Sequence, residues 1–479
     1  MIPSQLFLIN YFYKKSDMRY SLFLFLLLPL CSFEQNITGT WHGLLDVGKK
    51  LRLDIHITQE GSSFSGKLDS PDQGAKDIPA TKVEFSNGSL IFEVKNLGVA
   101  YSGLLKNDSV VGTFKQGGFT TSLVLTREEV IVKKANRPQE PKGPFSYVES
   151  EVTFENYIEK FPLAGTLTLP KGDGPFPAVI LVSGSGPQDR NEEILGHKPF
   201  WIIADFLTNQ GFAVLRYDDR GTGKSKGVFA AATSVELATD AESALDFMRN
   251  NPKIKKDKIS IAGHSEGAMI AVMLAAKIKD IHSIVLLAGP AIPGGELLLK
   301  QQFLINKASG VPDKTNKTIQ HFNRKIYKIV TEESTLETAK PIIEKKVRRS
   351  LKKAKEKDLA GYNSKEELIQ EALNNVCNPW MFYFIKYDPK NDLEKVNCHV
   401  LALNGSNDLQ VPPKENLSAM EMHIPKSSKS LVFKELPSLN HLFQECETGN
   451  ITEYETIEQT IQPGVLKLMG EWLISIQSN

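Results

Sequence analysis

Residues 258–275 read KISIAGHSEGAMIAVMLA, and this stretch decides the fold. A short β-branched apolar run leads into residues 263–267 (GHSEG), and a run with helical propensity follows. A G-x-S-x-G sequence between a strand and a helix is typical of a sharp turn that projects its serine hydroxyl into a cleft. The glycines of such a turn allow the backbone to approach neighbouring elements closely. The stretch therefore predicts that Ser265 is a nucleophile, and not part of an ordinary glycine-bounded turn.

Strands and helices alternate on both sides of this turn, from about residue 147 to the C-terminus. We predict an opening hairpin from strands 152–154 and 163–169. Six further strands are predicted at 177–182, 212–217, 259–262, 283–287, 400–403 and 431–436. Three helices are predicted at 199–207, 235–248 and 461–476. Strands joined by helical crossovers form a mostly parallel sheet with helices on both faces. The alternation is interrupted at about 293–387 by a polar helical insertion, which we expect to form a lid over the strand ends.

A serine hydroxyl becomes a good nucleophile when a histidine within hydrogen-bond reach takes its proton and a carboxylate orients that histidine. In parallel sheets the site forms at the carboxyl ends of the strands. Asp408 ends the loop after strand 400–403, and His441 lies in the loop after strand 431–436. We therefore predict Asp408 as the acid and His441 as the base, the alternative for His441 being a surface loop histidine. His399 and His423 stand before strands and are excluded.

Hydrolysis through a serine also needs two backbone N–H groups that bind the developing oxyanion. One is expected from Glu266, which follows the nucleophile, and the other from the loop after the first central strand. That loop is residues 183–190 (SGSGPQDR), and Ser185 is our candidate, with the register open by one residue.

The N-terminal third has a different pattern. Residues 35–127 contain short alternating runs separated by Asn, Gly, Asp and Ser, which predict a small antiparallel β-barrel or sandwich. Candidate strands are 51–57, 89–95, 99–105, 109–115 and 119–126. Within this region His42 and His56 lack carboxylate or cysteine neighbours at ligand spacing. Residues 128–146 have the proline- and charge-rich composition of a linker before the domain at 147–479.

Residues 1–34 predict export. Three basic residues precede an uncharged apolar run at 21–33 that is too short to span a bilayer, as in a secretory signal. The true start is possibly Met18. Cys31 follows Leu30, which is larger than the residue that lipoprotein sites favour, so we expect a periplasmic or extracellular protein without a lipid anchor.

Composition narrows the remaining classes. The chain has 479 residues, 41% hydrophobic and 24% charged, which is typical of a globular protein, and its net charge of +1 gives no general attraction for nucleic acid. Cys377, Cys398 and Cys446 are irregularly spaced and predict buried thiols, with no disulfide framework and no zinc site. Residues 221–225 (GTGKS) end like a phosphate-binding loop but lack the required glycine at position 218. We therefore expect neither metal nor cofactor.

Several motifs together resemble the α/β-hydrolase superfamily, specifically exported bacterial esterases and hydrolases grouped with serine aminopeptidase-like enzymes. They are GSGPQDRN (184–191), GHKPF (196–200), LRYDDRGTGKS (215–225), GHSEG (263–267), LNGSNDLQV (403–411) and His441. GTWHG (39–43) and DSPDQGA (69–75) resemble the β-domain fused to such enzymes. Ala268 departs from the second glycine common in relatives, which should affect helix packing only.

The resemblance implies cofactor-free hydrolysis of small-molecule carboxylic esters by Ser265, Asp408 and His441, through an acyl-enzyme. It leaves the acyl and alcohol groups open, as it does the role of the β-domain and the oligomeric state. Two alternatives stand beside this interpretation. One is an aminopeptidase or acyl-peptidase with the same triad, and the other is a ligand-binding protein with an inactive hydrolase scaffold.

Overall fold

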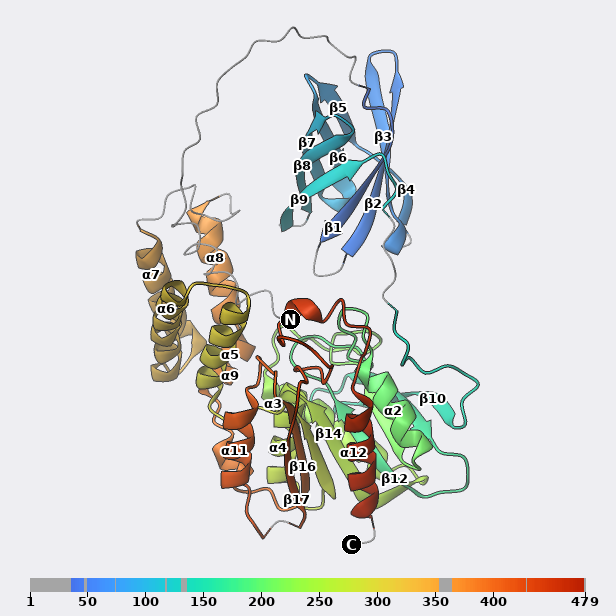
Figure 1. Ribbon diagram of the computed structural model, residues 1–479, viewed down its shortest axis with the longest axis vertical. Coiled ribbons are helices and arrows are strands. Elements are labelled where there is room, and N and C mark those ends of the chain that lie inside the picture. Colours follow the sequence, from blue (N-terminus) through green and yellow to red (C-terminus); the bar gives the residue numbers. More distant parts are fainter. Residues whose placement is uncertain are drawn as a thin grey trace. The chain divides into compact units, whose positions relative to one another are not determined.

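The computed structural model describes residues 36–46, 50–73, 75–116, 119–130, 136–352, 364–427 and 429–477. The predicted export signal at 1–34, with Met18 and Cys31, lies outside these residues. The described chain forms two compact units, 36–130 and 136–477 (Figure 1).

The first unit is a nine-stranded antiparallel sheet in the order β4-β3-β2-β1-β9-β8-β7-β6-β5. Along β6, Leu90, Phe92 and Val94 are buried and alternate with half-buried residues, because successive side chains of a strand point to opposite faces. The sheet is curled, since a Cβ on Gly66 in β3 would lie 3.4 Å from Val83 in β5. The strands are β1 (Gly39–Asp46), β2 (Lys50–Glu60), β3 (Ser63–Ser70), β4 (Ala75–Pro79), β5 (Lys82–Ser86), β6 (Ser89–Val94), β7 (Val99–Lys106), β8 (Ser109–Gln116) and β9 (Phe119–Thr126).

The prediction of a small antiparallel β-domain is confirmed, and its five candidate strands correspond to β2, β6, β7, β8 and β9. Its two histidines, which lack carboxylate neighbours at ligand spacing along the sequence, each have one across the strands. Strand pairing places His42 opposite Asp54, with the ring nitrogen 2.7 Å from the carboxylate, and brings His56 within 3.1 Å of Asp69. Sequence spacing does not show such pairs because they form across strands.

The second unit is built on an eight-stranded sheet in the order β10-β11-β13-β12-β14-β15-β16-β17. β10 (Val148–Glu155) and β11 (Pro162–Leu169) form the predicted antiparallel hairpin. The other six strands are mutually parallel and are β12 (Phe176–Val182), β13 (Ala213–Tyr217), β14 (Ile254–His264), β15 (Ser283–Leu287), β16 (His399–Gly405) and β17 (Leu431–Leu436). Every residue of β13, β15 and β16 is buried, as expected for strands covered on both faces.

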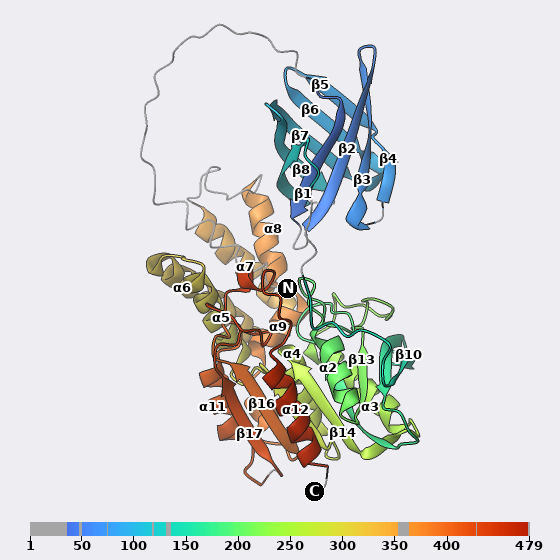
Figure 2. The same ribbon diagram turned by 45° about the vertical axis from the view of Figure 1, so that its right-hand side comes forward.

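Helices cover both faces of this sheet, as Figures 1 and 2 show. α3 (Ser234–Arg249), α4 (Glu266–Lys277) and α11 (Pro413–His423) bury apolar side chains against one face, whereas α2 (Pro199–Asn209) and α12 (Pro463–Ser475) pack on the other. α11 was not predicted. Cys398 is buried between strands and helices, while Cys377 and Cys446 are only half-buried.

The insertion at 293–387 is helical, as predicted. It contains α5 (Gly294–Ala308), α6 (Asp313–Glu332), α7 (Leu336–Leu351), α8 (Lys365–Val376) and α9 (Pro379–Lys386), and the short α10 (Lys390–Leu393) follows. These helices share a core of their own, to which Met269 of α4 and Val411 also contribute. In Figure 1 they gather past one end of the sheet. Over the described residues, no helix has the length and apolarity that crossing a membrane requires.

Candidate active site

Ser265 occupies the turn between β14 and α4. Its backbone has φ 52° and ψ −117°, a conformation that is rare for residues with a side chain and that marks functional sites when the surrounding structure enforces it. Close packing at the two glycines that flank Ser265 enforces this conformation. A Cβ on Gly263 would lie 2.1 Å from the Gly267 backbone, and a Cβ on Gly267 would lie 2.0 Å from the Val182 carbonyl oxygen. Both positions therefore require glycine.

Asp408 lies in the loop after β16 and is buried. Its Oδ1 accepts backbone N–H bonds from Gln410 (2.8 Å) and Val411 (2.9 Å). Its Oδ2 accepts from the Asn404 amide (3.1 Å) and from Nδ1 of His441 (2.8 Å). Four donors hold one orientation of the carboxylate, so the carboxylate in turn fixes the plane of the imidazole.

His441 lies in the loop after β17 and is 4% exposed. Asn440 braces this loop, because its Oδ1 accepts the backbone N–H groups of Leu442 and Gln444, both at 3.0 Å. Phe443 has φ 60°, a second residue held in the left-handed region close to the site. Since Asp408 accepts from Nδ1, the ring presents Nε2 as its free base nitrogen.

Ser265 and His441 line the same cavity. Among the described residues, no hydrogen bond joins the serine hydroxyl to the imidazole. Such bonds are often long without substrate and shorten in the reacting complex. The structure thus brings the predicted serine, acid and base, which are far apart in sequence, to one end of the sheet.

Both predicted oxyanion donors also line this cavity. Glu266 is the first residue of α4, where backbone N–H groups have no intrahelical acceptor. Within the part of the chain that the structure describes, no acceptor is bonded to the N–H of Glu266 or of Ser185. The N–H of Gly184, by contrast, donates to Glu192 Oε1 at 2.6 Å. This occupied neighbour favours Ser185 over Gly184 in the register that the sequence left open.

The sequence matches the family described as "Serine aminopeptidase, S33" over residues 200–363. It is 27% identical over 330 residues to Esterase EstD of Thermotoga maritima, covering 68% of this chain and 69% of that protein. Together with the parallel sheet and the serine turn, these similarities show that the second unit has the α/β-hydrolase fold. We call residues 136–477 the hydrolase domain.

Other similar proteins match the chain over shorter segments. Mouse peroxisomal succinyl-coenzyme A thioesterase is 29% identical over 143 residues, 29% of this chain and 30% of its own length. Mouse bile acid-CoA:amino acid N-acyltransferase is 31% identical over 139 residues, 28% of each chain. The chain thus spans less than a third of the length of these two relatives. Among solved structures, the α/β hydrolase GrgF of Penicillium has 17% identity and a TM-score of 0.44, over 69% of this chain and 100% of that one.

The LRYDDRGTGKS motif (215–225) holds residues 183–190 in place, the loop that carries the predicted oxyanion donor Ser185 and is called the oxyanion loop below. Asp219 accepts the Ser183 hydroxyl (2.7 Å) and the Gln188 N–H (2.9 Å), and burial raises its pKa well above the usual value. Asp218 binds the Arg190 guanidinium, with one N–O distance of 2.8 Å. In the sequence this motif was a sign of resemblance, and its end at 221–225 was weighed and rejected as a phosphate-binding loop. Its role could not be read from spacing, because the two loops are about 30 residues apart.

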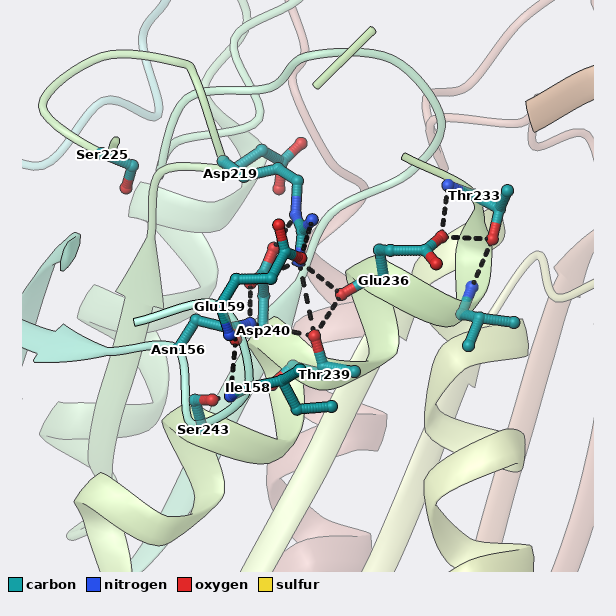
Figure 3. A network of polar contacts seen from close by, with 12 residues as sticks. Asn156, Ile158, Glu159, Asp219, Ser225, Thr233, Glu236, Thr239, Asp240 and Ser243 are labelled. Carbon is teal, nitrogen blue, oxygen red and sulfur yellow. Dashed lines mark hydrogen bonds and ion pairs between the residues drawn. The ribbon is translucent and has the colours of Figure 1, made fainter. Parts of the chain in front are cut away.

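Arg220, the next residue of the motif, faces the opposite way and joins elements away from the cavity. Its Nε donates to Asp240 at 2.7 Å and its Nη1 donates to Glu159 at 2.6 Å. Figure 3 shows this network, in which Asn156 and Thr239 also take part. Arg220 and Asp240 are both buried, so the pair ties α3 to the loop after β13, and the bond of Arg220 to Glu159 adds the loop after β10.

The cavity that Ser265 lines has a volume of about 120 Å³. Its apolar wall comes largely from the lid helices α5 and α9, through Leu297, Leu298, Trp380, Met381 and Phe384. The Trp380 indole N–H donates to Glu266 Oε1 at 2.7 Å, and the Ser234 hydroxyl donates to the same oxygen. Burial raises the pKa of Glu266, which favours its neutral form. Over the described residues, no cluster of three or more His, Cys, Asp or Glu is arranged to hold a metal.

Proposed function

We propose that the protein is a serine hydrolase that cleaves carboxylic esters through Ser265, His441 and Asp408. The observation that carries this proposal is the buried pair of Asp408 and His441, 2.8 Å apart, because His441 lines the same cavity as Ser265 in its strained turn. Similarity to Esterase EstD over 330 residues supports the same reaction class.

In the proposed reaction, Nε2 of His441 takes the hydroxyl proton as Ser265 attacks the ester carbonyl. The N–H groups of Ser185 and Glu266 hold the negative oxygen of the tetrahedral intermediate. His441 then protonates the departing alcohol, which leaves an acyl group on Ser265. Water, activated by the same imidazole, releases the acid and restores the serine.

The cavity wall supports a small, uncharged acyl group as the substrate. Its volume of about 120 Å³ is below the range of roughly 300–1,000 Å³ typical of sites for drug-sized ligands. The lining residues within the described chain include Glu192 and Glu266 but no lysine or arginine. An anionic acyl group would therefore meet no lysine or arginine, and the His264 ring in the lining is already bonded to Glu192.

The test is Ser265→Ala with short acyl esters of p-nitrophenol. We expect turnover to fall to background while the melting temperature stays close to that of the wild type, because the change removes one hydroxyl. Reaction of the wild type with a fluorophosphonate probe, lost in Ser265→Ala, is the second readout. A variant that hydrolyses the esters at the wild-type rate would exclude this mechanism.

A serine aminopeptidase is the second candidate, favoured by the family match and by the two carboxyl groups on the cavity wall. A peptidase could use these groups to bind a substrate ammonium. Both are already engaged, however: Glu192 bonds to His264 and to the Gly184 N–H, and the raised pKa of Glu266 favours an uncharged group. Parallel assays with acyl esters and aminoacyl p-nitroanilides distinguish the two, and we expect the esters to be the better substrates.

We also propose that the enzyme is exported, on the basis of the basic and apolar pattern at 1–34. N-terminal sequencing of the protein recovered from the periplasm or medium should find a start near residues 32–35. Recovery of full-length protein from the cytoplasm alone would contradict export.

A further inference from the structure

A second histidine–carboxylate pair lies beside the proposed triad. His264 directly precedes the nucleophile, and its Nδ1 is 2.9 Å from Oε1 of Glu192. The two side chains are buried, and the His264 ring lies 4.8 Å from the His441 ring, centroid to centroid. From the sequence alone, this histidine is more readily a packing residue than a second base.

The pair connects the three loops on which the reaction depends. Nε2 of His264 donates to the backbone carbonyl of His441 at 3.0 Å, which fastens the loop of the base. Oε1 of Glu192 accepts the N–H of Gly184 at 2.6 Å, next to the oxyanion donor Ser185. His264 itself is joined to Ser265 through the chain. One ion pair therefore touches the segments of base, nucleophile and oxyanion donor.

The hydrogen bonds define the charge of the pair. A carbonyl oxygen can only accept, so Nε2 of His264 carries a proton, and an ionised Glu192 calls for a proton on Nδ1 as well. Burial opposes the charged ring, but the Glu192 carboxylate and the bond to the His441 carbonyl outweigh it, and the pKa of His264 is raised. The pair is thus a buried, hydrogen-bonded histidine–carboxylate pair.

Backbone strain and close packing mark the same place. Glu192 has φ 52°, in the left-handed region that side-chain-bearing residues rarely adopt. A Cβ on Gly184 would lie 3.2 Å from both Glu192 Oε1 and the Ser265 Cβ. The oxyanion loop therefore packs closely against the nucleophile, and the Glu192 carboxylate fixes the position of the loop relative to Ser265.

We propose that His264 and Glu192 are positioning residues that hold the Ser185 N–H and the His441 imidazole in register with the Ser265 hydroxyl. This inference rests on the proposed serine hydrolase function. The pair is expected to stabilise the transition state and not the bound substrate, because neither residue needs to contact the substrate in order to align the reacting groups. Loss of the pair should lower kcat and leave KM nearly unchanged.

Four variants test this with an acetyl ester and with a fluorophosphonate probe. Glu192→Ala removes the acceptor for Gly184, and we expect kcat to fall about 100-fold, the lower end of the effect of losing one oxyanion donor. Glu192→Gln keeps an oxygen acceptor and should retain kcat within about tenfold of the wild type. His264→Ala should lower kcat by at least about tenfold by freeing the loop of the base.

The double variant Glu192→Ala/His264→Ala separates positioning from stability. Removal of one partner leaves a buried group uncompensated, whereas removal of both does not. The double variant should therefore melt at a higher temperature than either single alanine variant but remain as slow. The control is His282→Gln, a buried histidine that also bonds to a backbone carbonyl, that of Ile476, at the opposite end of β15. It should react at the wild-type rate.

The rate of phosphonylation of Ser265 gives the deciding outcomes. A parallel loss of kcat and phosphonylation rate in the alanine variants, with recovery in Glu192→Gln, supports the proposal. Wild-type phosphonylation and kcat in the double variant would overturn it, as would an effect on KM alone. A wild-type protein that neither reacts with the probe nor cleaves esters would instead overturn the proposed function, and this result is distinguishable from the others.

Discussion

At the scale of single residues, hydrogen bonds hold the polar side chains of the site in one orientation each. Asp408 uses both oxygens on four donors, and His441 has one ring nitrogen left for chemistry. Because the carboxylate and the imidazole are both buried, water does not compete for the hydrogen bond between them. The pair therefore keeps its orientation in the absence of substrate.

Asp408→Asn should lower kcat by about 10⁴-fold, by analogy with the same change in a serine protease triad. An asparagine amide can donate to Nδ1 and so stabilise the tautomer in which Nε2 carries the proton and cannot act as a base. Steady-state kinetics with an acetyl ester measures the effect. Asp388→Asn, an exposed aspartate before β16, is the matched control and should retain full activity. A comparable loss in both variants would contradict the assignment.

At the scale of elements, the turn between β14 and α4 depends on two glycines that let a helix begin against neighbouring backbone. Gly267→Ala would force a methyl group to within 2.0 Å of the Val182 carbonyl oxygen. We expect the unfolding free energy to fall by about 1–3 kcal/mol, the usual cost of overpacking. Urea denaturation measures it. Gly143→Ala, whose Cβ would come no closer than 3.9 Å to a neighbour, should change it little.

The lid helix α9 sets the size of the cavity through Trp380, which stacks on Phe384 and bonds to Glu266. Trp380→Ala should open space for longer acyl chains. The ratio of kcat/KM for hexanoyl over acetyl esters should then rise about tenfold, because burying one or two further methylene groups favours the longer ester by about that factor. Phe382→Ala on the same helix, which lines a different hollow, is the control. An unchanged ratio in Trp380→Ala would mean that acyl groups bind elsewhere.

At the scale of the whole molecule, each unit buries an apolar core of its own residues, and the hydrolase core also encloses neutral histidines. His197 and His282 are buried, and burial lowers the pKa of each from 6.5 to about 4. Burial also lowers the pKa of His399, whose ring nitrogens have no hydrogen-bond partner in the described residues.

Acid should therefore unfold the hydrolase domain. The unfolded chain binds protons near pH 6.5, whereas the folded domain resists them down to about pH 4, so stability is lost as the pH falls through this window. His264, Asp219, Asp240 and Glu266, whose pKa values are raised, act in the opposite direction, so the part that a neutral histidine contributes is measured by replacing it. We expect the melting temperature to fall by about 5 °C or more between neutral pH and pH near 4.5. Calorimetry measures it, and the fall should be smaller in His282→Gln.

The sequence by itself determined the elements and their order. Apolar periodicity and the GHSEG turn predicted the parallel strands, the helices on both faces and the helical insertion, because these depend on neighbours along the chain. Asp408 and His441 were predicted because each lies in a loop directly after a predicted strand, which is also a local feature of the chain. The resemblance to α/β-hydrolases joined these predictions into one site.

Only the tertiary structure decided which side chains meet across those loops. The bonds of Asp219 to the oxyanion loop, of Trp380 to Glu266 and of Glu192 to His264 and Gly184 link residues that no local pattern connects. Such contacts form when separate loops converge at one edge of the sheet, and their geometry is set by packing and burial. For that reason the sequence identified the candidate reacting groups, while the groups that align them became visible in the folded chain.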